Sequence, residues 1–170
     1  MIREFSAGGV VLRFMQDQWW IAAIEPQRSQ DEKSKTSKPV LALPKGLIDK
    51  DEKPAETALR EVREETGVDA SLIAKLTDIK YVYVRSWGDK QRVFKVVSFY
   101  LLAYRSGNLG AISPDMQVEV ARAEWVPLDE AHKRLSYSGE RQVVRLAQRY
   151  VNANPLTTVQ RHPHEHESER

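Results

Sequence analysis

One stretch of the chain, residues 46 to 68 (GLIDKDEKPAETALREVREETGV), constrains the fold more than any other. It fits the pattern G-x5-E-x7-R-E-U-x-E-E-x-G-U, in which U is an aliphatic residue, at every fixed position. Pro54 suits the first turn of a helix, and Gly67 suits the position just after its end. The stretch therefore predicts a helix from about Pro54 to Thr66.

This predicted helix has two chemically different faces. At about 100 degrees per residue, its apolar side chains gather on one face: Ala55, Ala58, Leu59 and Val62. Glu61, Glu64 and Glu65 gather on another, where like charges cost roughly 0.2–0.5 kcal/mol per pair in an isolated helix. We therefore expect a cation to offset the repulsion, and carboxylate oxygens suit hard divalent ions such as Mg2+. The alternative is a solvated acidic helix face.

The remaining elements are predicted from runs of strand-forming residues, turn residues and helical periodicity. Strands are expected over residues 5–14, 19–24, 40–43, 72–85, 91–104 and 117–127. Helices are expected over residues 128–135 and 139–152. A strand-rich order with inserted helices predicts an α+β fold, arranged as an α/β/α sandwich with a mixed β-sheet.

At the acidic stretch the chain resembles the Nudix hydrolases, whose defining box has this pattern. The resemblance extends over about residues 2 to 150 and implies the same sandwich. We expect one domain over residues 1–152, with residues 27–38 as a surface loop or, alternatively, a lid. Residues 153–170 have little to bury, which predicts a disordered tail.

The resemblance also implies roles for the acidic residues. Glu61, Glu64 and Glu65 would bind Mg2+ or Mn2+, with Glu64 or Glu61 as the catalytic base. Glu52 and Arg60 would orient these glutamates, although an exposed ion pair of little consequence is the alternative.

One further glutamate lies outside the box. Glu119, six residues before Trp125, matches an additional metal ligand or base in some members of the family. An exposed strand glutamate is an equal alternative at this position.

Candidate substrate-binding residues lie outside the helix. Lys45 and Gly46 enter the box on a loop, where the ammonium could neutralise a phosphate oxygen. Aromatic and basic side chains on the predicted hairpin and before the last helix could stack on a base and contact a polyphosphate. The candidates among them are Tyr83, Arg92, Lys95 and Tyr137, for which core packing or ordinary surface charge is the alternative.

The composition of the chain excludes some classes of binding partner. The formal charge of +2 provides no large field for nucleic acid, so no nucleic-acid partner is expected. The chain has no cysteine, and no run approaches the roughly 18 apolar residues of a membrane helix. We therefore expect a cytoplasmic protein with a nucleotide substrate and no membrane partner. The sequence does not predict an oligomeric state.

The resemblance implies hydrolysis of a phosphoanhydride bond in a nucleoside diphosphate linked to another group. Four segments resemble the dinucleoside polyphosphate hydrolases: residues 4–9, 43–46, 92–95 and 135–140. The expected reaction is asymmetric cleavage of diadenosine tetraphosphate to ATP and AMP. The alternatives are a pyrophosphatase for modified nucleoside triphosphates, an enzyme for diphosphoinositol polyphosphates or nucleotide sugars, and a nucleotide sensor without turnover.

Overall fold

A computed structural model describes residues 1–28 and 38–155. The predicted surface loop of residues 27–38 and the predicted tail of residues 153–170 therefore lie mostly outside the described residues.

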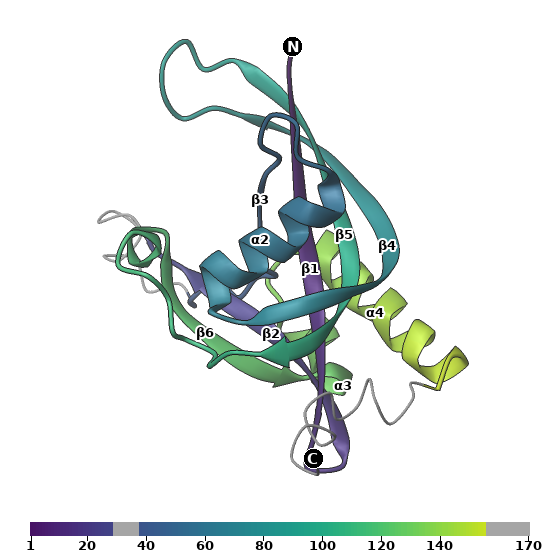
Figure 1. Ribbon diagram of the computed structural model, residues 1–170. Helices are drawn as coiled ribbons and strands as arrows, with labels where there is room; N and C mark the ends of the chain where they lie inside the picture. The colour runs from purple at the N-terminus through teal and green to yellow at the C-terminus, as the bar shows by residue number, and fades with distance from the viewer. Residues whose placement is uncertain (29–37, 156–170) are drawn as a thin grey trace.

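A mixed β-sheet forms the middle layer (Figure 1). Its strands are β1 (Ile2–Met15), β2 (Gln18–Pro26), β3 (Lys45–Leu47), β4 (Asp69–Val84), β5 (Arg92–Ser106) and β6 (Val120–Pro127). The order is β4-β5-β1-β2-β6, and β3 pairs with β1. The β1–β5 pair is parallel and the other pairs are antiparallel. The expected mixed sheet is confirmed.

Helices cover both faces of this sheet (Figure 1). They are α2 (Pro54–Thr66), α3 (Leu128–Arg134) and α4 (Ser138–Ala153), with a short 3-10 helix, η1 (Met116–Val118). Alternation along β1 divides the core, because Val10 packs in the cluster with α3 and α4 whereas Val11 packs in the cluster with α2. The α/β/α sandwich predicted from the sequence is confirmed. None of the helices within the described ranges has the length and apolar character needed to span a bilayer.

The helix α2 has the bounds that its punctuation predicts. Pro54 occupies its first turn, and Gly67 ends it with a left-handed φ of 82°, donating its N–H to the carbonyl of Arg63. Ala58 and Val62 are fully buried against the sheet. Glu61 and Glu65 lie at the margin of that face, each less than a tenth exposed. The apolar face thus fixes the direction in which the acidic side chains point.

Two predicted strands differ from the structure. Residues 40–43 form only an isolated bridge, between Ala42 and Ile24, and are not a strand. Their backbone is satisfied by side chains instead: the N–H of Leu41 donates to Ser136 Oγ, and that of Leu43 donates to Glu140 Oε1. Residues 41–43 are therefore a buried segment outside the regular sheet, although their composition is typical of a strand. Hydrogen bonds to Ser136 and Glu140 fix this segment next to the start of α4.

The second difference concerns residues 117–127. Strand β6 begins only at Val120, opposite Pro26, and η1 precedes it. Pro26 ends β2 and has no N–H to donate, which limits further pairing at this point. Glu119 therefore follows a 3-10 helix, and the expectation that it lies on a strand was wrong.

Candidate functional site

Arg60 joins three of the predicted site glutamates in one ion-pair network. Its Nε and Nη2 donate to the two carboxylate oxygens of Glu52 at 2.8 and 2.9 Å. Its Nη1 donates to Glu61 at 3.0 Å and to Glu64 at 3.1 Å. The hydrogen bond from Arg60 holds the pKa of Glu52 down, at about 2. The guanidinium therefore orients the carboxylates of α2 from a fixed position.

Glu65 lies at the buried end of the acidic cluster. Burial, reinforced by the charge of Glu61 and with a smaller contribution from Glu119, raises the pKa of Glu65 to about 8. One of its oxygens accepts the backbone N–H of Lys45 at 3.1 Å. Burial likewise raises the pKa of Glu61, and the neighbouring Glu64 and Glu119 add to the effect against the opposing charge of Arg60. Glu65 is thus a carboxyl that a nearby cation would ionise.

Glu119 comes from outside α2 yet acts on the same cluster. Its charge raises the pKa of both Glu61 and Glu65, so its carboxylate lies near theirs. Its backbone carbonyl accepts the N–H of Gln27, which ties the turn before β6 to the end of β2. Glu119 therefore belongs to the electrostatic surroundings of Glu61 and Glu65.

The donor set fits a hard divalent cation in chemical type and charge, because crowded carboxylates with raised pKa values favour a positive ligand. As they stand, no three Asp, Glu, His or Cys side chains in residues 1–28 and 38–155 are arranged to hold an ion. In this arrangement Nη1 of Arg60 donates to both Glu61 and Glu64.

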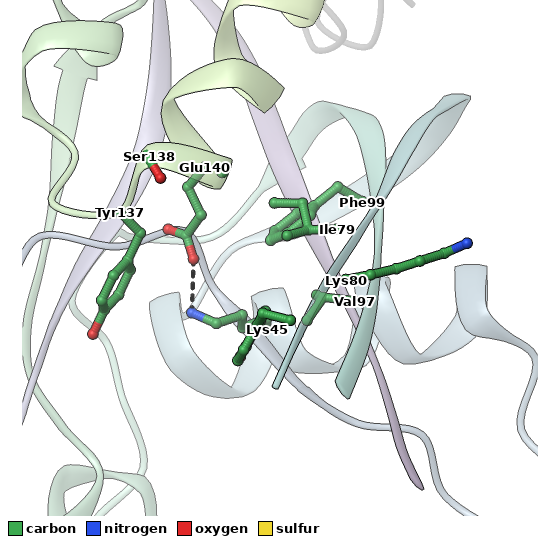
Figure 2. A pocket seen from close by; sticks show the side chains of 10 residues that line it. Lys45, Ile79, Lys80, Val97, Phe99, Tyr137, Ser138 and Glu140 are labelled. Carbon is green, nitrogen blue, oxygen red and sulfur yellow. Dashed lines mark ion pairs between the residues drawn. The ribbon is translucent and has the colours of Figure 1, made fainter. Parts of the chain in front are cut away.

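A pocket of about 610 Å³ adjoins this cluster through Lys45. Figure 2 shows Lys45 and Glu140 joined by an ion pair on one side of it, with Tyr137 beside them and Ile79 and Phe99 opposite. Strand β4 contributes Ile79 and Tyr81 to the lining. The complete lining consists of Lys45, Ile79, Lys80, Tyr81, Val97, Phe99, Tyr137, Ser138, Gly139 and Glu140. Apolar and aromatic walls with one buried ion pair suit a nucleobase or nucleoside.

The other predicted substrate residues take different places. Tyr83 donates its hydroxyl to Glu4 at 2.8 Å and lies outside the pocket lining. Lys95 stands opposite Tyr81 and Glu4 in the sheet register, where burial lowers its pKa. Arg92 lies opposite Val84, at the far end of the hairpin and away from the pocket. Gly46, paired with Ala7 on β1, lies directly below α2.

Lys45 and Tyr137, predicted from the sequence to bind substrate, both line this pocket, and that role stays a prediction. The sequence did not single out Glu140. Glu140 is 4% exposed. Its carboxylate accepts the backbone N–H of Leu43 and pairs with the ammonium of Lys45. Along the chain it resembles any acidic residue in the first turn of a helix. A buried partner so distant in sequence leaves no local pattern, so only the fold reveals it.

Fold and site together define an α/β/α sandwich protein with an acidic, cation-suited helix beside a nucleoside-sized pocket. The family model described as "NUDIX domain" matches residues 6–147. The chain therefore belongs to the NUDIX domain family.

Two relatives share substantial sequence with the chain. The "Putative mutator protein MutT4" of Mycobacterium tuberculosis is 40% identical over 111 residues, which are 65% of this chain and 42% of the relative. The "8-oxo-(d)GTP phosphatase" of Mycolicibacterium smegmatis is 34% identical over 104 residues, 61% of this chain and 29% of the relative. The chain thus spans less than half the length of the curated relatives it matches.

A solved structure shows the same fold. The crystal structure of a Caenorhabditis elegans Ap4A hydrolase binary complex has a TM-score of 0.67 with 17% identity, covering 89% of this chain and 99% of that one. Identity at this level establishes the sandwich architecture alone.

Proposed function

We propose that this chain is a divalent-metal-dependent hydrolase that cleaves a phosphoanhydride bond in a nucleotide. The observation that carries the proposal is the hydrogen-bonded network of the box carboxylates, in which Arg60 binds Glu52, Glu61 and Glu64. Next to it, Glu65 accepts the backbone N–H of Lys45, which lines the pocket. The family membership supports it, since a complete box with every carboxylate in place is expected of an enzyme. A sensor without turnover would not need the whole set.

In this proposal the glutamates of α2 and Glu119 hold Mg2+ or Mn2+. When bound, the metal supplies charge neutralisation at the phosphate oxygens and lowers the pKa of a coordinated water. Glu64, the most exposed of the three box glutamates on α2, accepts the proton of the attacking water. Arg60 keeps its bonds to Glu52 and orients the carboxylates during turnover.

For the substrate we propose a dinucleoside polyphosphate, with diadenosine tetraphosphate cleaved to ATP and AMP. Tyr81 and Tyr137 both line the pocket and offer aromatic faces for one adenine. Lys45 lies between the pocket and the carboxylates, and Lys95 stands on the same sheet face as Tyr81. Two lysines near these aromatic residues suit the charge of a polyphosphate chain.

A second candidate rests on the sequence relatives. Because proteins named as a mutator protein and an 8-oxo-(d)GTP phosphatase share 40% and 34% identity with the chain, a modified nucleoside triphosphate is the competing substrate. The same catalytic glutamates would then release a monophosphate and pyrophosphate.

A product assay separates these candidates. With Mg2+ present, diadenosine tetraphosphate, 8-oxo-dGTP and ADP-ribose are offered separately, and the products are resolved by ion-exchange chromatography. ATP with AMP from the first substrate, at the highest kcat/KM of the three, would support the dinucleoside assignment. Monophosphate and pyrophosphate from the second would move the substrate to triphosphates, and no product from any would refute hydrolysis of these nucleotide classes.

A further inference from the structure

Glu140 is a buried carboxylate with both oxygens committed. Its Oε1 accepts the backbone N–H of Leu43 at 2.7 Å, and its Oε2 lies 2.9 Å from the ammonium of Lys45. The side chain comes from the first turn of α4, on the face of the sheet opposite α2. A buried carboxylate is costly unless it is paired and hydrogen-bonded, as this one is.

The ammonium of Lys45 is correspondingly restrained. Burial alone would lower its pKa, but the adjacent carboxylate of Glu140 raises the pKa above its ordinary value. The Nζ atom also lies 5.6 Å from the centre of the Tyr137 ring (Figure 2). A lysine side chain has four rotatable bonds and about 2 kcal/mol of rotamer entropy, so a fixed partner determines where its charge stands.

Lys45 has a second attachment that does not involve its side chain. Its backbone N–H donates to Glu65, a carboxylate of the acidic cluster on α2. The side chain of Lys45 thus lines the pocket, whereas its backbone N–H contacts the acidic cluster. A change at Glu140 should therefore disturb substrate binding and leave the main-chain bond to Glu65 in place.

We propose that Glu140 is a positioning residue, which acts through Lys45 by holding the ammonium at the pocket wall where it meets the substrate phosphates. The inference rests on the proposed function and extends it to a residue that contacts no reacting atom. If so, Glu140 contributes to substrate affinity only when the ammonium of Lys45 is present. The competing explanation is that Glu140 has a structural role alone, in which its contacts attach α4 to residues 41–45.

The test compares Glu140→Gln, Lys45→Met and the double variant in steady-state hydrolysis of diadenosine tetraphosphate at saturating Mg2+. Glutamine keeps an oxygen for the Leu43 N–H and removes only the charge. We expect each single variant to raise KM about tenfold with kcat changed less than about threefold, the pattern of lost ground-state binding. The double variant should match Lys45→Met within about twofold. Glu130→Gln, on an exposed residue of α3, is the matched control and should behave as the wild type.

An unchanged KM in Glu140→Gln or in Lys45→Met would overturn the proposal, as would a double variant whose KM rises by the product of the single effects. A fall in kcat alone would equally overturn it. Glu140→Gln leaves a partly buried ammonium without its partner and can fail to fold. In that event Glu140→Asp, which keeps the charge but shortens the side chain by one methylene, takes its place: a raised KM would support the positioning role, and an unchanged KM would overturn it.

Wild-type turnover separates this inference from the proposed function. If the wild type hydrolyses the substrate and the variants do not shift KM, only the positioning role fails. If the wild type shows no turnover of diadenosine tetraphosphate, the proposed substrate fails, and the same variants are compared by calorimetric Kd for diadenosine tetraphosphate with Mg2+. A tenfold weaker Kd in both single variants, about 1.4 kcal/mol, would still support the positioning role, whereas equal affinity or no binding by the wild type would refute it.

Discussion

The carboxylate of Glu61 occupies the space into which a side chain at position 46 would extend. A Cβ built on Gly46 would overlap all three atoms of that carboxyl group. Gly46 has no left-handed φ, so the requirement is steric and does not arise from backbone conformation. The absence of a side chain at Gly46 therefore leaves the space that the carboxylate of Glu61, a predicted metal ligand, occupies.

Gly46→Ala should displace the Glu61 carboxylate and weaken Mg2+ binding. We expect kcat/KM to fall at least about tenfold, because a small misplacement of a metal ligand is costly to catalysis. Mn2+ affinity measured by electron paramagnetic resonance should fall in parallel. Gly88→Ala is a control, since its Cβ meets nothing within 4 Å although its φ of 67° adds strain. It should lower thermal stability modestly and leave metal affinity unaltered.

Glu64→Gln should lower kcat by several orders of magnitude while nucleotide affinity changes little. Glutamine is of equal size but cannot take the proton from the attacking water. Single-turnover hydrolysis and equilibrium binding, measured on the same preparation, check the two halves of the prediction. Retention of a tenth of the wild-type kcat would remove Glu64 from the role of base.

Glu65 predicts a pH dependence of stability in metal-free protein. Its pKa is about 8 when folded against 4.5 for the free group, so between these values the folded chain holds a proton that the unfolded chain has lost. This carboxyl therefore makes the free energy of unfolding decrease as the pH rises from about 4.5 to 8. Glu65→Gln should make the decrease shallower in urea titrations at pH 5, 6, 7 and 8. A slope identical to that of the wild type would contradict the raised pKa.

Arg60→Lys should destabilise the acidic cluster, because a single ammonium cannot contact Glu52 with two nitrogens and reach Glu61 and Glu64 with a third. We expect a lower Tm and a kcat reduced more than about tenfold. Arg63→Lys provides the control on the same helix, since within residues 1–28 and 38–155 the side chain of Arg63 has one ion pair, an exposed contact of 3.8 Å with Asp69. If the two variants had the same Tm and kcat, the multiple hydrogen bonds of the Arg60 guanidinium would not be needed for stability or catalysis.

The two pocket tyrosines can be tested against an aromatic outside the pocket. Tyr81→Leu and Tyr137→Leu should each raise KM by roughly 5- to 100-fold, the equivalent of 1–3 kcal/mol of base stacking. Trp87→Leu, at the exposed turn of the hairpin, should leave KM unchanged. If neither tyrosine variant shifts KM, the pocket does not hold the base.

Local signals explain which parts of this molecule could be predicted from the sequence. The bounds of α2 follow from Pro54 and Gly67, and its buried face follows from helical periodicity. The sandwich follows from the order of the elements and from the family resemblance. These features depend on residues close together in the chain, where spacing determines geometry.

Features that depend on distant residues could not be predicted in the same way. Residues 40–43 have the composition of a strand, but the N–H groups of Leu41 and Leu43 donate to Ser136 and Glu140, which lie 95 and 97 residues away in sequence. The hydroxyl of Tyr83 likewise donates to Glu4, which is 79 residues away in sequence, and a role of Tyr83 in base stacking stays a prediction. No pattern of spacing encodes such pairings, because the tertiary fold alone brings the partners together.

The parallel pairing of β1 with β5 has a consequence for synthesis. Ile2 lies opposite Val93 and Leu12 opposite Ala103, so the central strand leaves the ribosome long before its neighbour exists. The hairpin of β1 and β2 must therefore persist with an open edge until β5 arrives. Glu140 emerges later still, on α4. A nascent chain therefore carries every box carboxylate before it has the helix that supplies Glu140 to the Lys45 pocket.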